Sequence, residues 1–163
     1  MRILQLKIKN FRQFYGECEL NFLSDDTSRI TVIHGENGSG KTSLLNAFKW
    51  VLYGTTDFDT GNQTILNELA LSETAIGSVA ELSLELKFEH EGSTYTVHRK
   101  QDFKRTSDAL EVDAIGTSVP TLRWINEKGG TETAQNPANR INQLIPEQMH
   151  SYFFFNGERI EKL

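Results

Sequence analysis

The sequence has few of the features that characterise secreted or membrane proteins. Cys18 is the only cysteine among 163 residues, so the chain can form no internal disulfide and no cysteine-based zinc site. No apolar run approaches the roughly 18 residues that a membrane-spanning helix needs. Residues 1–7 are too short and too charged a stretch for a signal peptide. We therefore expect a cytoplasmic protein with no membrane partner.

Positive charge is also scarce. Seventeen Lys and Arg residues stand against 22 Asp and Glu residues, for a net charge of −5, which argues against a strongly basic nucleic-acid coat. A local cluster of Arg99, Lys100, Lys104 and Arg105 remains, with only Asp102 among them. A solvated strand end and a phosphate contact both explain this cluster, and the sequence leaves the choice open. Length and an apolar fraction of 37% predict one globular domain with a core.

One stretch carries a recognisable chemistry. Residues 35–42 read GENGSGKT, which is the G-x-x-x-x-G-K-T spacing of a phosphate-binding P-loop. Glycines let backbone N–H groups approach a triphosphate, and the N-terminus of the following helix favours its negative charge. Lys41 can reach the outer phosphates, and the Thr42 hydroxyl can ligate the Mg²⁺ that bridges them. The alternative is an incidental Gly/Ser turn; a buried-strand pattern before the loop and an amphipathic helix pattern after it argue against that reading.

Hydrophobic periodicity predicts a mixed α/β sheet. We expect strands at residues 2–11, 17–22, 29–34, 78–89, 94–100, 110–115, 121–126 and 151–155. We expect helices from the P-loop to about residue 53, at 64–71 and at 137–145. The third strand should be buried on both faces, and a turn is expected at residues 14–16. A simple kinase or GTPase would continue with alternating strands and helices after the P-loop helix, whereas this chain places antiparallel strands there.

Several phrases of the sequence resemble one class of ATPases. Residues 8–12 (IKNFR), 35–47 (GENGSGKTSLLNA) and 52–54 (LYG) resemble the N-terminal lobe of SMC-like ATPase heads. That class includes the RecF and RecN repair ATPases and the ATPase of the double-strand-break repair nuclease. Residues 11–16 (FRQFYG) and 153–160 (FFFNGERI) look most like DndD, the SMC-like ATPase associated with bacterial DNA phosphorothioate (sulfur) modification. The implied fold class is α/β: a P-loop NTPase, the N-terminal lobe of an ABC/SMC-type head, with a mixed sheet and an antiparallel β insertion.

The resemblance also implies an organisation. Such heads split their ATPase into two lobes joined by a long antiparallel coiled coil. Residues 1–163 would form the N-terminal lobe, as a fragment or an excised lobe, and residues 157–163 would begin the coil. Asp57-Phe58-Asp59 is not read as a Walker B motif, because no apolar strand precedes it. The implied partners are the C-terminal lobe of the same ATPase, a second head in a homodimer, and DNA, contacted directly or through partner subunits.

The implied cofactors are ATP and Mg²⁺. Arg12 matches an arginine that contacts nucleotide phosphates in such heads; the alternative is a surface arginine at a strand end. Asn156 falls at the position of the Q-loop glutamine, where it would contact Mg²⁺ directly or through water; the alternative is a plain Asn-Gly turn. The expected catalytic residues are Lys41 and Asn156, and the expected metal ligands are Thr42 and Asn156. The expected nucleotide-binding residues are Arg12, Gly35, Asn37, Gly38, Ser39, Gly40, Lys41, Thr42 and Ser43.

Three functions are weighed on this basis. The first is an ATPase that, as a full-length dimer, hydrolyses ATP to ADP and phosphate and drives DNA-associated work in DNA sulfur modification, phage defence or repair. Alone, the chain should bind nucleotide weakly and turn over little. The second is a scaffold lobe that binds DNA or partner subunits without nucleotide. The third, a compact kinase or GTPase, is disfavoured because no second acidic motif and no nucleobase-reading motif is present.

Overall fold

The computed structural model describes residues 1–22, 31–58 and 65–149. The strands in these ranges are β1 (Arg2–Phe11), β2 (Phe14–Asn21), β3 (Val79–His90), β4 (Ser93–Arg105), β5 (Val112–Ile115), β6 (Thr121–Ile125) and β7 (Thr131–Thr133). The helices are α1 (Lys41–Tyr53), α2 (Glu68–Glu73), α3 (Pro137–Leu144) and a short 3₁₀ turn, η1 (Glu147–Met149). None of these helices combines the length and the apolar character needed to cross a membrane.

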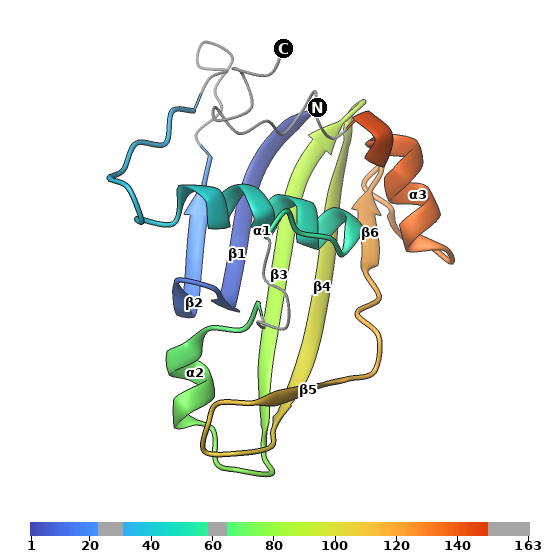
Figure 1. Ribbon diagram of the computed structural model, residues 1–163. Helices are drawn as coiled ribbons and strands as arrows, with labels where there is room; N and C mark the ends of the chain where they lie inside the picture. The colour runs from blue at the N-terminus through green and yellow to red at the C-terminus, as the bar shows by residue number, and fades with distance from the viewer. Residues whose placement is uncertain (23–30, 59–64, 150–163) are drawn as a thin grey trace.

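The strands form one sheet, and α1 crosses one of its faces (Figure 1). Their order is β2-β1-β3-β4-β6-β7, with β5 paired to β4 outside this path. Every ladder between the described strands is antiparallel. The helix α2 lies near the end of the β1–β2 hairpin, and α3 lies beside β6, so α1 alone covers the centre of the sheet (Figure 1).

The β1–β2 hairpin closes through Arg12 and Gln13. Phe11 pairs with Phe14 across this turn, and Arg12 takes a left-handed backbone with φ of 50°. The turn predicted at residues 14–16 is therefore wrong, because these residues belong to β2. Gly16, the residue that suggested a turn, instead lies beside a register shift between the strands. Its N–H donates to the Asn10 side chain there.

The β3–β4 hairpin confirms its prediction and is longer than expected, since β4 continues to Arg105. The ladder runs without a register shift from the Val79–Lys104 pair to the His90–Ser93 pair. Positive φ at both turn residues, Glu91 and Gly92, suits the tight turns that match strand twist. This hairpin forms the long axis of the sheet, and β1 pairs with it through β3.

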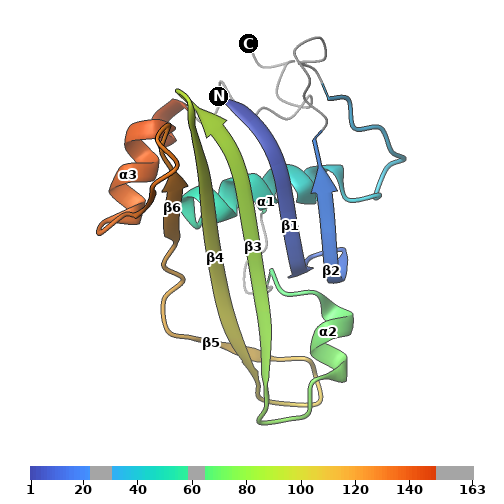
Figure 2. The same ribbon diagram turned by 180° about the vertical axis from the view of Figure 1, so that it is seen from behind.

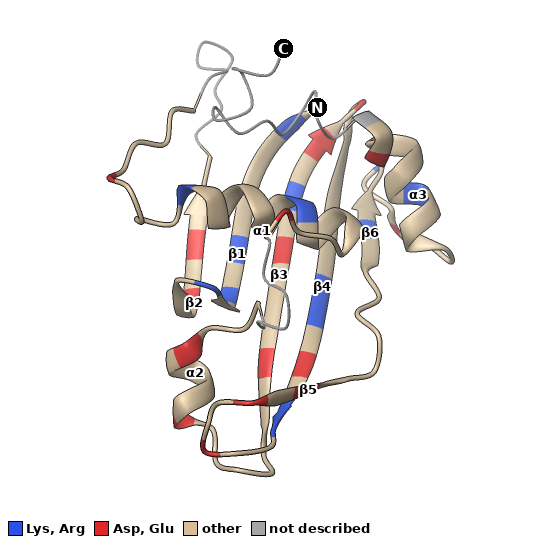
Figure 3. Ribbon diagram, in the orientation of Figure 1, with Lys and Arg blue, Asp and Glu red and all other residues tan. Residues whose placement is uncertain are grey.

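The core lies between α1 and the sheet, because alternate side chains of each strand point toward the helix. Its fully buried large side chains include Leu6, Ile8, Phe11, Leu52, Leu82, Leu84, Leu86 and Phe88. The opposite face carries no helix (Figure 2), and residues of both charges occur along β1 to β4 (Figure 3). Trp50 and Phe48 are core residues, as the sequence predicts.

The strand predicted over residues 29–34 is not formed in the part that the structure describes. Residues 31–34 lie outside any strand, and Val32 and Ile33 are 83% and 48% exposed. A strand needs a partner for its backbone groups. In the described sheet β1 is already paired on both sides, with β2 and β3, so it offers no free edge to this segment. Residues 29 and 30 lie outside the described ranges.

The remaining elements depend on caps. The helix predicted at residues 64–71 begins only at Glu68, because the Asn67 side chain accepts a hydrogen bond from the Ala70 N–H and caps it there. The helix predicted at residues 137–145 is confirmed, with Asn136 as its N-cap and Pro137 in its first turn. Strand β7 was not predicted. The strand expected at residues 151–155 and the coil start expected at 157–163 lie outside the described residues.

Candidate functional site

The P-loop joins α1 through two glycines that the geometry requires. Gly40 is the N-cap of α1 and takes φ of 99°, in the left-handed region that side chains disfavour. At Gly35, an added Cβ would lie 2.4 Å from the Ser39 hydroxyl oxygen and 3.3 Å from the Ser39 Cβ, so a larger residue would displace the Ser39 side chain. The loop is therefore closed on itself immediately before the helix.

Lys41 fastens this loop from the first residue of α1. Its Nζ donates to the carbonyl oxygens of Gly35 at 2.6 Å and Glu36 at 2.7 Å. An ammonium group has three N–H donors, so one remains for an anion. Lys41 and Thr42 are both exposed, and the first-turn N–H groups of α1 have no intrahelical partner. A cation, a hydroxyl and a positive helix end thus gather at one exposed point, which suits a phosphate chain with its metal ion.

The β1–β2 turn lies against the same helix end. The Ser43 hydroxyl donates to the side-chain oxygen of Gln13. An added Cβ on Gly40 would lie 3.7 Å from Phe14 and 3.9 Å from Gln13. Gln13 was not predicted as a site residue; the only sequence signal is its place next to Arg12. The turn therefore brings Arg12 into the neighbourhood of the P-loop.

The Arg12 backbone is held by two hydrogen bonds, whereas the Nε donor of its side chain lacks a partner within the described part of the chain. Its N–H donates to the Ile65 carbonyl at 2.9 Å, and its own carbonyl accepts from the Asn67 side chain. The guanidinium carbon lies 4.7 Å from the ring centroid of Phe58. The Nε atom is buried and finds no hydrogen-bond partner among the described residues. A buried donor without a partner is costly, so this geometry favours an anion-binding role over a plain surface arginine.

A second set of polar contacts fixes α1 from the side. Asn46 donates to the Thr42 carbonyl at 2.9 Å and accepts from the Asp57 N–H. The Asp57 carboxylate pairs with the Lys49 ammonium, whose side chain is only 4% exposed. The loop after α1 is thus attached to the helix that carries the P-loop. Asp57 is occupied by this ion pair, which agrees with not reading it as Walker B, and Asp59 lies outside the described residues.

The C-terminal end of α1 is attached to the sheet and to α3. Arg99 on β4 donates to the carbonyl oxygens of Val51 and Leu52, both at 3.2 Å, and of Ser118 at 2.7 Å. Burial lowers the pKa of Arg99 to about 10, so it stays charged at neutral pH beside the negative end of the helix. The Tyr53 hydroxyl donates to the Ile145 carbonyl at 3.2 Å.

The basic cluster of β4 does not form a phosphate-binding patch. Arg99 points into the core, whereas its neighbour Lys100 lies on the opposite face and pairs with Glu81 at 3.5 Å. Arg105 donates to backbone carbonyls before β3, including that of Thr74 at 2.7 Å. Alternation along the strand separates residues that are adjacent in sequence. The structure therefore favours the structural interpretation of this cluster.

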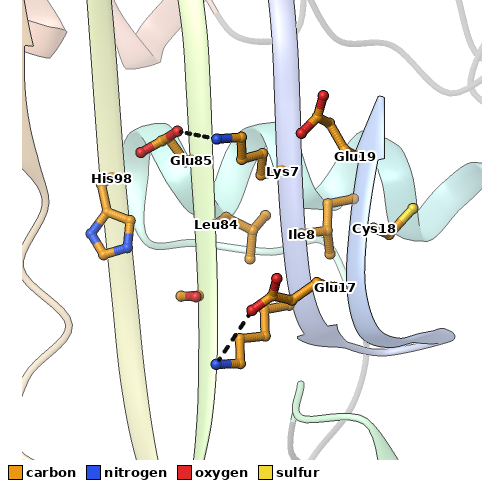
Figure 4. A pocket seen from close by; sticks show the side chains of 10 residues that line it. Lys7, Ile8, Glu17, Cys18, Glu19, Leu84, Glu85 and His98 are labelled. Carbon is orange, nitrogen blue, oxygen red and sulfur yellow. Dashed lines mark ion pairs between the residues drawn. The ribbon is translucent and has the colours of Figure 1, made fainter. Parts of the chain in front are cut away.

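The helix-free face of the sheet has an open hollow of about 440 Å³, shown in Figure 4. Its lysines already have carboxylate partners: Lys7 lies 3.3 Å from Glu85, and Lys9 lies 3.2 Å from Glu81 and 3.8 Å from Glu17. The hydrogen bond from Lys9 is the largest cause of a lowered pKa at Glu81. Because these charges cancel, the hollow is a poor site for a polyanion.

The structure brings most of the predicted residues together. Residues 35–43 form one loop and helix start, and Arg12 sits on the turn packed against it. The donor set of Lys41, Arg12 and the helix end fits a triphosphate, and the exposed Thr42 hydroxyl fits a magnesium ligand. Asn156, predicted to contact metal, lies outside the described residues.

Comparison with known proteins gives a consistent result. A protein family described as "AAA domain" matches residues 5–163. The DNA double-strand break repair Rad50 ATPase of Halobacterium salinarum is 41% identical over 123 residues, 76% of this chain and 12% of that protein. The Rad50 ATPase of Methanococcus maripaludis is 34% identical over 145 residues, 89% of this chain and 12% of that protein. One subunit of the nuclease SbcCD from Vibrio cholerae is 27% identical over 152 residues, 91% of this chain and 14% of that protein.

Among solved structures, the SMC head domain from Thermotoga maritima is similar with a TM-score of 0.44 and 27% identity. The match covers 89% of this chain and 41% of that chain. The chain spans only 12–14% of the length of the three curated relatives given above.

Proposed function

We propose a function for this chain, which belongs to the AAA domain family over residues 5–163. The antiparallel sheet and α1 fit the predicted fold class, the N-terminal lobe of an SMC-type head. We propose that the lobe binds Mg²⁺-ATP and that the full-length protein is an SMC-like ATPase acting in DNA repair. The observation that carries this proposal is the closed loop of residues 35–40, with Lys41 and Thr42 exposed at the start of α1. The Rad50 and SbcCD relatives support the DNA-repair context.

Each residue of the site has a defined task in this proposal. The Lys41 ammonium and the first-turn N–H groups of α1 bind the phosphate chain and hold it in place. The Arg12 guanidinium adds a second cation from the β1–β2 turn. Thr42 would hold Mg²⁺, which supplies charge neutralisation between the outer phosphates. Ser43, fixed by Gln13, keeps the turn and the helix start in register with each other.

Hydrolysis needs parts outside the described residues. We propose that the C-terminal lobe and a second head complete the site in a homodimer, and that Asn156 contacts the metal or its water. DNA would be engaged directly or through partner subunits. The finer assignment, a DndD-like ATPase of DNA sulfur modification, rests on the phrases at residues 11–16 and 153–160. A scaffold lobe that works without nucleotide is the rival function, and nucleotide-independent binding of DNA or a partner would favour it.

Lys41→Ala tests the proposal. Without the ammonium, the loop loses its two internal hydrogen bonds and the phosphates lose their first cation, so calorimetric binding of Mg²⁺-ATP should disappear. Lys104→Ala, at an exposed position on β4, is the matched control and should bind as the wild type does. Unchanged binding in Lys41→Ala would refute the assignment. Robust steady-state ATPase activity from residues 1–163 alone would contradict the need for a second lobe.

A further inference from the structure

We infer that Phe58 is a positioning residue: its ring, anchored to α1 through Asp57, presents the Arg12 guanidinium to the nucleotide phosphates. The sequence singles out Asp57 and Phe58 only as a motif without a function. The inference rests on the proposed function, because it requires Arg12 to act on a bound nucleotide.

The Arg12 side chain lies against the ring of Phe58. Its guanidinium carbon stands 4.7 Å from the Phe58 ring centroid, while its Nε finds no hydrogen-bond partner among the described residues. A cation above an aromatic ring is attracted by the ring's π electrons, which uses none of its N–H donors as hydrogen bonds to another residue. Phe58 can therefore fix the position of Arg12 without using the donors that a phosphate needs.

Phe58 is itself held by its ring contact with Phe11 and by the bonds of the preceding Asp57. Its ring packs at 6.4 Å from that of Phe11, which is fully buried and packs in turn at 6.1 Å from Trp50 of α1. The preceding residue, Asp57, is bonded to α1 twice, through its N–H to Asn46 and through its carboxylate to Lys49. The ring is thus fixed to the helix from both sides.

Asn46 connects these contacts to the P-loop. Asn46 also donates to the carbonyl of Thr42, the predicted magnesium ligand. The helix that presents Lys41 and Thr42 therefore also carries, through Asp57 and Phe58, the support for Arg12. Arg12 belongs to β1–β2 and the P-loop to α1, so their relative placement depends on packing between elements. The Phe58 ring supplies that link at the guanidinium itself.

A double-mutant cycle on the full-length protein tests the inference. Phe58→Leu keeps an apolar side chain against Phe11 but removes the aromatic face, and Arg12→Ala removes the cation. Calorimetry with Mg²⁺ and adenylyl imidodiphosphate should show each single variant binding about threefold to tenfold more weakly. The double variant should bind no more weakly than Arg12→Ala alone. Phe58→Tyr keeps the aromatic face and should bind within about twofold of the wild type.

A purely structural role for Phe58 predicts different results. Additive losses in the cycle, unchanged affinity in Phe58→Leu, or equal losses in Phe58→Leu and Phe58→Tyr would each overturn the inference. If Phe58→Leu does not fold, Phe58→Met replaces it, because methionine also packs against Phe11 without an aromatic face and should reduce affinity only while Arg12 is present. Lys41→Ala distinguishes failure of the proposed function from failure of the role of Phe58. Normal binding there refutes the proposed function, whereas lost binding there with an additive cycle refutes only the role of Phe58.

Discussion

The two members of the Lys49–Asp57 ion pair should contribute very unequally to stability. The Lys49 side chain is 4% exposed, whereas that of Asp57 is 36% exposed. Asp57→Ala would leave the ammonium of a buried lysine without its counter-ion. Lys49→Met would leave a carboxylate that water can reach, while the methionine keeps most of the apolar stem in place.

The magnitudes follow from this asymmetry. Breaking a buried pair by removing one partner costs about 3–5 kcal/mol when the remaining charge stays buried. An exposed partner costs about 1 kcal/mol or less when it is left alone. For a chain of this size, each kcal/mol lowers the melting temperature by about 2–4 °C. Asp57→Ala should therefore melt at least about 6 °C lower, and Lys49→Met should melt within about 4 °C of the wild type.

Urea and thermal unfolding followed by circular dichroism measure both variants. The double variant Lys49→Met/Asp57→Ala is the informative control, because it removes the buried charge together with its partner. It should recover most of the stability lost in Asp57→Ala. Equal losses in the two single variants, or a double variant no more stable than Asp57→Ala, would refute the reasoning from burial.

Two further predictions concern the C-terminal end of α1. Arg99→Lys keeps the charge but replaces three separate nitrogens with one, which cannot reach the carbonyls of both segments at once. Urea unfolding should therefore show a loss of about 2–4 kcal/mol; an unchanged midpoint would contradict the assigned bonds. Burial, with a smaller contribution from Glu147, raises the pKa of Tyr53 to about 12. Its contribution to stability is therefore present below pH 10 and lost as the pH rises toward 12. Tyr53→Phe should remove this alkaline loss and cost about 0.5–1.5 kcal/mol at neutral pH through the missing bond to Ile145. The same alkaline profile in both proteins would show that Tyr53 is not the group responsible.

Local patterns in the sequence located the elements whose stability is local. The alternation over residues 78–89 predicts β3, and the Asn136-Pro137 pair predicts the start of α3. The P-loop spacing predicts both the loop and the start of α1, where Gly40 caps the helix. These signals need no knowledge of what packs against them.

The sequence predicted less accurately those features that depend on pairing with another strand. Residues 29–34 have the composition of a buried strand, yet Val32 and Ile33 are exposed where the structure describes them. Gly16 marks a register shift and not the turn that its residue type suggested. Both outcomes depend on which strands pair with each other, and a short stretch of sequence does not show which strands will pair.

The side chains that support the site were the hardest to foresee. Gln13, Asn46 and Lys49 are ordinary polar residues in sequence, and their roles arise only when α1 packs beside the β1–β2 turn and the loop that follows it. Phe58 likewise reads as one more apolar residue until Arg12 is found above its ring. Contacts between segments far apart in the chain carry no periodic signal.

The bonds from Lys41 to the carbonyls of Gly35 and Glu36 bear on the thermodynamics of ligand capture. Because these bonds already hold the loop in shape, the entropy of ordering it is lost when the chain folds and not when a ligand arrives. If the proposed function is correct, an incoming phosphate chain would meet a loop that is already assembled and would use the third N–H donor of Lys41. Nucleotide capture as proposed would therefore resemble binding to a preformed surface more than the coupled folding of a flexible segment.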